Sequence, residues 1–457
     1  MLKTLRVVSG GLVLVLGACG MEDADVTSTS SALEADRNQF GIAESFHTTG
    51  AIDFTNPMFQ QLGTNPRSCA TCHGPDMGWT LTSQKARQLF RESDGLDPLF
   101  NLVDEGSRPD ADISTEAARR VTFDTLLDLG VTRFSRNIPP AGEFVVTAVN
   151  DPSGFSTLTR VLSFRRPTPM ANEAKTASLT STGGPHPDIR VALAGFFGGA
   201  ATLHLQRDPA NPTPQDVRDQ GAAFLMDLFF AQAKDDRAGR LDIAGAKGGP
   251  ENVYLQPYTV GANDILDPAF TRKVFDIYDA WAVYDRDNGH SDCRHDRGRG
   301  SARASIYRGQ ELFNNFEFAI SGVPGFNDVM GQDTVMGTCS TCHNVPNMGG
   351  HAVFRLMDIG TTLPENCDPR IPMVTVQHKT TGETRTLCDM GRGGNGTWAD
   401  LGKFRVPPLR GLAARAPYFH DGQAKSIAAA IRYHQKRFDI GMSHRQRQDL
   451  EAFLGAL

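Results

Sequence analysis

Two copies of the pattern Cys-x-x-Cys-His lie far apart in the chain, as CATCH at residues 69–73 and CSTCH at residues 339–343. At the start of a helix, the side chains at positions i, i+3 and i+4 project from one face. Two thiols placed in this way can form thioether bonds with the vinyl groups of a haem, while the imidazole reaches the iron. The pattern therefore predicts two covalently bound haem c groups. The residues expected to hold them are Cys69, Cys72 and His73 for the first haem and Cys339, Cys342 and His343 for the second.

Two other interpretations of the motif fit less well. A thioredoxin-like redox pair needs the two cysteines but not the histidine that follows them. Half of a zinc site would need two further ligands nearby, and the two motifs are distant in sequence. If haem is bound, the sixth ligand of each iron decides the function. Two protein ligands favour electron transfer, whereas an open face binds peroxide or O₂.

The N-terminus has the features of an export signal. Lys3 and Arg6 precede an apolar run at residues 7–18 that is too short to span a bilayer as a mature helix. The run ends in Leu-Gly-Ala-Cys, which resembles a bacterial lipobox, so we expect lipid attachment at Cys19; ordinary signal cleavage nearby is the alternative. Residues 1–18 would then be a lipoprotein signal peptide. The prediction is a lipid-anchored protein of the periplasm or cell envelope.

The rest of the chain divides around the two motifs. Residues 19–45 are acidic and rich in Ser and Thr, so we expect a flexible tether. The 457 residues are enough for two or three domains, and we place one haem c domain at residues 46–300 and a second at residues 301–457. The expected fold is mainly α, with two cytochrome c-like haem domains, long loop insertions and a small β-hairpin. A net charge of −6 argues against nucleic acid as a partner.

Three helices are predicted from apolar periodicity. Residues 301–315 carry apolar side chains on one helical face, and residues 443–457 begin with Ser443 as an N-cap. These two helices should pack across one another beside the second motif. Residues 219–233 are apolar enough to predict a buried helix.

The cysteines outside the motifs predict one disulfide. Residues 367–388 contain two β-prone stretches separated by Thr-Thr-Gly-Glu, which indicates a hairpin. A disulfide between Cys367 and Cys388 would fasten this hairpin in an oxidising compartment. Cys293 is then left over, in a basic loop.

Residues 404–422, FRVPPLRGLAARAPYFHDG, closely resemble the C-terminal half of the bacterial di-haem cytochrome c peroxidase and MauG family. Residues 165–172 (RRPTPMAN) and 196–206 (FFGGAATLHLQ) are similar, more weakly, to two upstream motifs of that family. With both haem motifs in order, the resemblance covers most of residues 55–457. It implies a peroxidatic haem in the N-terminal domain and an electron-transfer haem in the C-terminal domain.

The resemblance implies a sixth ligand for the second iron. In the peroxidases this ligand is a Met 14 residues after the histidine of PYFH, and in the MauG-like branch it is a Tyr; the same count from His420 leads here to His434. Tyr433 is the neighbouring rival, and a surface histidine is the alternative. We expect His343 and His434 to hold this iron. Imidazole raises the reduction potential of a haem less than a thioether does. The potential of this haem should therefore be lower than in a Met-ligated peroxidase, which brings the protein nearer to the MauG-like branch.

At the first iron, the resemblance implies an open sixth position. The peroxidases often carry a removable histidine where this chain has Leu89. The catalytic Gln of the family matches Gln206, which we therefore take as catalytic, but the Glu that accompanies it has no counterpart. His204, Asp208 and Asp216 are substitutes by proximity only.

Two other positions depart from the family. Its Trp between the haems aligns with Phe196 or Phe197, and Phe has no hydrogen-bond donor. Its calcium ion, also between the haems, has two ligand positions that align with Arg166 and Arg415. Calcium requires oxygen ligands, so we expect no calcium and suggest that the arginines replace its charge.

These observations predict a di-haem oxidoreductase that reduces hydrogen peroxide at the first haem. Its electrons would come from a small donor protein, a cytochrome c or a cupredoxin, through the second haem. One alternative is a MauG-like oxidase or oxygenase that acts on an organic or protein substrate. The apolar side chains of Phe196 and Phe197 would suit O₂ or an apolar substrate. A two-haem electron carrier without catalytic activity is the other.

Overall fold

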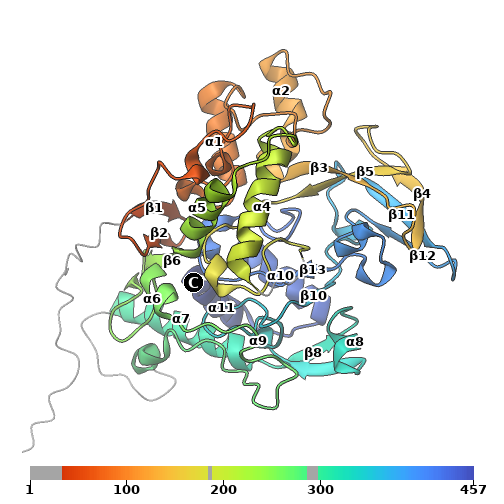
Figure 1. Ribbon diagram of the computed structural model, residues 1–457. Helices are drawn as coiled ribbons and strands as arrows, with labels where there is room; N and C mark the ends of the chain where they lie inside the picture. Colours follow the sequence, from red (N-terminus) through yellow and green to blue (C-terminus); the bar gives the residue numbers. More distant parts are fainter. Residues whose placement is uncertain (1–32, 184–187, 286–296) are drawn as a thin grey trace, which may run out of the picture.

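The computed structural model describes residues 33–183, 188–285 and 297–457, and it is a mixed α/β structure (Figure 1). About 34% of the chain is helix and 16% is strand, with five small sheets. The expected mainly α fold with two cytochrome c-like domains is therefore wrong. Strands occur outside the expected hairpin, for example FVVTAVN at residues 144–150, because β-branched and aromatic residues pack well on a pleated surface.

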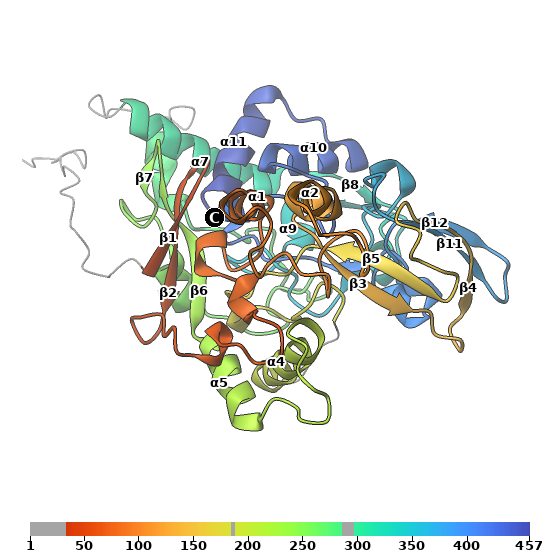
Figure 2. The same ribbon diagram turned by 90° about the horizontal axis from the view of Figure 1, so that it is seen from above.

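The helices are short and scattered between loops. Their bounds are α1 (Ser83–Ser93), α2 (Glu116–Thr122), α3 (Asp124–Leu129), α4 (Ile189–His204), α5 (Gln215–Met226), α6 (Pro250–Leu255), α7 (Arg297–Asn315), α8 (Asn327–Met330), α9 (Cys339–Cys342), α10 (Ile427–Phe438) and α11 (His444–Gly455). In Figure 2, α7, α10 and α11 lie along one side of the molecule, and α4 and α5 lie on the opposite side.

All the strand pairs are antiparallel. The sheets have the orders β1-β2-β6-β7, β12-β11-β4, β3-β5, β8-β9 and β10-β13. The strand bounds are β1 (Leu33–Asn38), β2 (Gly41–His47), β3 (Thr132–Asn137), β4 (Phe144–Asn150), β5 (Arg160–Arg165), β6 (Leu228–Asp235), β7 (Gly239–Arg240), β8 (Phe318–Ser321), β9 (Thr334–Gly337), β10 (Leu356–Met357), β11 (Met373–His378), β12 (Thr384–Leu387) and β13 (Phe404–Arg405).

The N-terminal sheet changes two expectations. β1 and β2 occupy residues 33–47, so the segment expected as a flexible tether is ordered from residue 33 onward. β6 lies between β2 and β7, and nearly all of its residues are buried. The helix expected at residues 219–233 therefore ends at Met226, because the apolar run that follows is a strand buried on both faces. The expected signal peptide and Cys19 lie outside the described residues, as does Cys293.

The helices beside the second motif are confirmed. α7 and α11 pack against each other, and the Ser443 hydroxyl accepts the backbone N–H of Gln446 at 3.2 Å as an N-cap. The two helices touch at Gly309, where a Cβ atom would lie 2.0 Å from the carbonyl oxygen of Asp449. The Asp449 carboxylate then accepts two hydrogen bonds from Arg308, at 2.8 and 2.9 Å, which fixes the crossing.

One sheet joins the two halves of the chain. β11 and β12 form the expected hairpin, and the Cys367–Cys388 disulfide is present. β4, from the N-terminal half, pairs with β11 along most of its length. Residues on both sides of position 300 therefore share one hydrogen-bonded sheet. No helix within the described ranges combines the length and the apolar character needed to cross a bilayer.

Candidate cofactor sites at the two Cys-x-x-Cys-His motifs

The two motifs fold into nearly the same single turn. The first begins as a 3-10 turn at Cys69–Thr71, and the second is α9. The hydroxyl of Thr71 accepts the backbone N–H of the residue before the first cysteine at 3.1 Å, and the hydroxyl of Thr341 makes the same bond at 2.9 Å. In each motif the histidine N–H donates to the carbonyl of the first cysteine, at 3.0 and 3.1 Å. The turn thus holds the cysteines and the histidine in one short unit.

The two histidines are oriented in the same way. Nδ1 of His73 donates to the carbonyl of Trp79 at 3.2 Å, and Nδ1 of His343 donates to the carbonyl of Gly349 at 2.6 Å. In both cases the acceptor lies six residues after the histidine and has a positive φ, 59° at Trp79 and 71° at Gly349. Because a carbonyl only accepts, the proton is on Nδ1, and the lone pair of Nε2 remains for a metal.

The protonation states suit this role. Burial lowers the pKa of His73 and of His343 to about 4, so both imidazoles are neutral. Burial also raises the pKa of the four motif thiols, to about 12 at Cys69, so the sulfurs are protonated. A zinc ion needs more ligands than one motif supplies. Among residues 33–183, 188–285 and 297–457, the one group of three possible ligands close enough for an ion is Cys388, His420 and Asp421, which contains no motif residue and whose sulfur is in the disulfide.

At the second motif, α10 brings His434 toward His343. Nδ1 of His434 donates to the carbonyl of Ala430 at 2.9 Å, which again leaves Nε2 available. A charge on His434 would lower the pKa of His343, so the two rings are within electrostatic range. Burial lowers the pKa of His434 itself, so this ring too is neutral. The hydroxyl of Tyr433, the rival ligand, donates instead to the carbonyl of Ile359 at 2.9 Å.

Of the four further histidines in residues 301–457, His351 and His420 bear on the candidate sites. Both nitrogens of His351 are used, since Nδ1 donates to the carbonyl of Cys342 at 2.8 Å and Nε2 accepts from Arg355 at 3.1 Å. His351 therefore supports the second motif, as a structural residue. His420 stacks on Phe404 with the ring centres 4.3 Å apart, and neither of its nitrogens has a hydrogen-bond partner.

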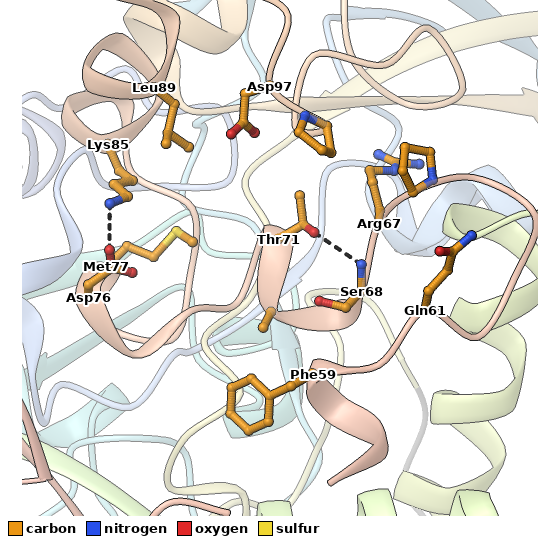
Figure 3. A pocket seen from close by; sticks show the side chains of 13 residues that line it. Phe59, Gln61, Arg67, Ser68, Thr71, Asp76, Met77, Lys85, Leu89 and Asp97 are labelled. Carbon is orange, nitrogen blue, oxygen red and sulfur yellow. Dashed lines mark hydrogen bonds and ion pairs between the residues drawn. The ribbon is translucent and has the colours of Figure 1, made fainter. Parts of the chain in front are cut away.

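A cavity of about 370 Å³ adjoins the first motif (Figure 3). The Lys85–Asp76 ion pair, at 2.5 Å, lies on one side of it and Thr71 on another. Leu89, at the position of the removable histidine of the peroxidases, also lines it. The lining includes neither Cys72 nor His73, so the cavity lies next to the motif without containing its ligands.

Buried charges surround the first motif. Arg67, only 2% exposed, donates to Asp104 at 2.5 Å and to Glu105 at 2.8 Å. Glu105 is fully buried and lies 4.0 Å from the sulfur of Cys72. Burial raises the pKa of Glu105. The same burial opposes ionisation of Asp104, but its hydrogen bonds from His204 and Glu105 and the charge of Arg67 outweigh burial and lower its pKa to about 2.

The residue that reaches the first motif from α4 is His204, at the last position of that helix. Its Nδ1 donates to the carboxylate of Asp104, and a charge on its ring would lower the pKa of His73. Gln206 is exposed, with φ of 57°, and no hydrogen bond of its side chain is present among the described contacts. Gln206 thus stays a prediction from the resemblance, while the geometry directs attention to His204.

The other residues singled out from the resemblance are also placed. Asp208 and Asp216 are exposed. Phe197 is 2% exposed and packs in one apolar cluster with Trp79, and Phe196 lies at the edge of that cluster. Nothing in the sequence pointed to Asp104, since it lies 100 residues before its partner His204 and in a loop without a motif. Two adjacent acidic residues in an apolar surrounding, LVDEG, were the only signal.

Neither a protein-family model nor a curated protein gives a match to this sequence.

Proposed function

We propose that this chain is a di-haem c-type oxidoreductase that reduces hydrogen peroxide with electrons from a small redox protein. The observation that carries the proposal is the repeated turn, in which two free cysteines precede a neutral histidine whose Nε2 is available. The donor set fits a covalently attached haem, because it offers two sulfurs for thioethers and one imidazole for the iron. When bound, each haem would supply a one-electron redox centre, and one with an open face would bind peroxide.

The residues around the second motif suit electron transfer. His343 and His434 each keep Nε2 available while a backbone carbonyl holds Nδ1, so both can act as ligands with little rearrangement. The rings of Phe419 and Phe438 lie 5.8 and 6.3 Å from the ring of His434 and restrict its movement. Such a site would pass electrons without binding a substrate.

The residues around the first motif suit proton transfer. Nδ1 of His204 donates to the carboxylate of Asp104, and this hydrogen bond fixes the orientation of the ring, whose side chain is 47% exposed. The ring can therefore take a proton at Nε2 from peroxide and return it to the oxygen that leaves. Arg67 holds the Asp104 carboxylate in place from the other side. His204 thus fills the role for which the family uses a Glu.

One observation favours a second candidate, the two-haem electron carrier. His204 lies within electrostatic range of His73 and has the ligand-like pairing with a carboxylate, so it could instead bind the first iron. Both irons would then have two histidine ligands. Phe197, which would have lined an apolar substrate site for a MauG-like oxidase, is buried in the core, so no observation adds to that alternative.

Electron paramagnetic resonance of the ferric protein separates the two candidates. The pyridine haemochrome assay should first give two haems per chain. The peroxidase predicts one high-spin and one low-spin haem, and peroxide turnover with a reduced small cytochrome c. Replacement of His204 by Gln should lower that turnover about 100-fold or more, the usual size of an acid–base contribution. Two low-spin haems and no turnover would establish the carrier, and a protein without haem would overturn the proposal.

A further inference from the structure

Three arginine side chains, of which Arg415 is buried and Arg166 and Arg405 are partly buried, lie near one another between the two motifs. Arg166 follows β5, Arg405 ends β13, and Arg415 ends the 3-10 turn Leu412–Arg415. Burial lowers the pKa of Arg415 most, and the charges of Arg166 and Arg405 lower it further, so both lie within electrostatic range of Arg415. Three cations from three separate segments are thus gathered in one place.

The protein itself does not neutralise them. Arg415 is 4% exposed and donates only to the carbonyls of Gly78, at 3.0 Å, and Arg410, at 2.8 Å, while its Nη2 has no partner. Arg166 donates from Nη2 to the carbonyl of Leu81 at 2.9 Å, and its Nε has no partner. Arg405 donates to a backbone carbonyl as well. A carbonyl accepts a hydrogen bond but carries no net charge, so these contacts position the guanidinium groups without balancing them.

Two carboxylates lie within electrostatic range of Arg415, Glu173 and Asp36. Burial raises the pKa of each to about 7, and each has one oxygen without a hydrogen-bond partner. Even if both are ionised, the three guanidinium groups keep a net positive charge. An unpaired charge in a low-dielectric interior is strongly disfavoured, so the cluster requires an anion that the chain does not provide.

The cluster reaches both motifs. The carbonyl that accepts from Arg415 belongs to Gly78, in the short segment between His73 and the residue that orients it. On the other side, the N–H of Leu409, four residues after Arg405, donates to the carbonyl of Met348 at 2.8 Å, one residue before the carbonyl that orients His343. An anion held here would lie between the two sites.

We infer that Arg166, Arg405 and Arg415 form a binding site for the propionate carboxylates of the two haems. The inference rests on the proposed function, because only bound haem brings these carboxylates into the interior. Planar guanidinium groups suit carboxylates because they can bind them through two parallel hydrogen bonds. The cluster thereby supplies fixed positive charge at the place where the resemblance puts a calcium ion, and it ties the C-terminal half of the chain to both cofactors.

The decisive variant is Arg415→Gln in the haem-loaded protein, with Arg410→Gln as the matched control. Arg410 is also buried and donates to the carbonyl of Gly249 at 3.0 Å, and its charge is not among the main causes that shift the pKa of Arg415. Arg415→Gln should retain two haems, shift the propionate bending band in resonance Raman spectra, and lower the midpoint potential of at least one haem. We expect a change of about tenfold in the reduction equilibrium, which is 59 mV for one electron. Arg410→Gln should change neither the band nor the potential.

Equal shifts in both variants, or none in Arg415→Gln, would overturn the inference while the two haems of the wild-type protein still supported the proposed function. If Arg415→Gln does not fold, Arg166→Gln takes its place, and the wild-type protein gives two further tests. Metal analysis should find no stoichiometric calcium, and a chelator should leave the visible spectrum unchanged; calcium bound one to one would contradict the site. Dialysis against low-salt buffer followed by chloride should leave the propionate band in place, whereas a chloride-dependent band would assign the site to a free anion.

Discussion

The two motif regions have the same kind of turn, but the residues that surround the two turns differ. In both, a threonine hydroxyl caps the turn and a carbonyl six residues later holds the histidine. Around the second histidine lie the ring of Phe313, with the ring centres 6.1 Å apart, and His434. Around the first lie Arg67 and a buried pair of acids, and beyond them His204. The attachment is therefore the same at both places, and the neighbours set the chemistry.

This difference follows from electrostatics in a low-dielectric interior. An apolar surrounding with a neutral second imidazole stabilises an iron with two fixed ligands and excludes other chemistry. A network of buried charges is costly to maintain unless each member is paired. It can, however, hold a proton where a reaction needs one. Five experiments would break or sharpen this comparison.

The largest effect is expected when one pair of cysteines is removed. The double variant Cys69→Ser, Cys72→Ser should lose about half of the covalent haem and leave a low-spin spectrum, because only the site with two histidine ligands remains. The double variant Cys339→Ser, Cys342→Ser should lose the other half and leave a high-spin spectrum. Pyridine haemochrome assays and electron paramagnetic resonance measure both results. Identical residual spectra would show that the two sites do not differ.

The next effect concerns the sixth ligand of the second site. His434→Gly should convert about half of the total haem, the low-spin part, to high-spin, since one of two protein ligands is gone. Added imidazole should restore the low-spin signal. His351→Gln is the matched control, because both nitrogens of His351 already have partners in the protein. A low-spin signal that survives in His434→Gly would remove His434 from the site.

A smaller effect is expected in the charge network of the first site. Arg67→Met should destabilise the protein by about 3–5 kcal/mol, because it leaves two buried carboxyl groups without their cation. Arg272→Met, at the exposed ion pair with Glu317 in the half of the chain that carries the second motif, should cost about 1 kcal/mol or less. Urea unfolding of the haem-loaded proteins gives both values, and equal losses would contradict the contrast between the sites.

The same network predicts a dependence on pH. The pKa of Asp104 is lowered from 3.8 to about 2. Its contribution to the free energy of unfolding is therefore fully present above about pH 4 and is lost as the pH falls toward 2. In Arg67→Met, the stability lost as the pH falls toward 2 should be smaller than in the wild-type protein, because the charge of Arg67 no longer helps to lower the pKa of Asp104.

The smallest effect tests what the two sites have in common. Thr71→Val and Thr341→Val each remove one side-chain hydrogen bond to a backbone N–H in an otherwise similar turn, so each should cost about 1 kcal/mol. Thermal unfolding of the two variants side by side provides the measurement. Costs that differ several-fold would mean that the turns are not equivalent.

Features built from neighbouring residues were predictable from the sequence. Helices at α7 and α11, the cap at Ser443, the hairpin of β11 and β12 and its disulfide are all confirmed. Each depends on apolar spacing, turn residues or a cysteine pair within a short segment, and short-range interactions specify such features.

The fold class was not predictable in the same way. β6 consists of a continuous apolar run, which periodicity does not distinguish from a buried helix. β4 pairs with β11 from the other half of the chain, and this long-range pairing leaves no mark in the sequence around either strand. The sheets that contain β4 and β6 thus depend on contacts between segments that are distant in sequence.

For the candidate sites, the sequence by itself determined the two turns with their cysteines and histidines, because a five-residue spacing is enough to place them on one face. The tertiary structure alone decided which side chains surround each motif histidine. It brought Asp104 to His204, and it gathered Arg166, Arg405 and Arg415 between the motifs. Such contacts depend on how segments that are distant in sequence pack together. In a buried interior, this packing also decides which charges are paired.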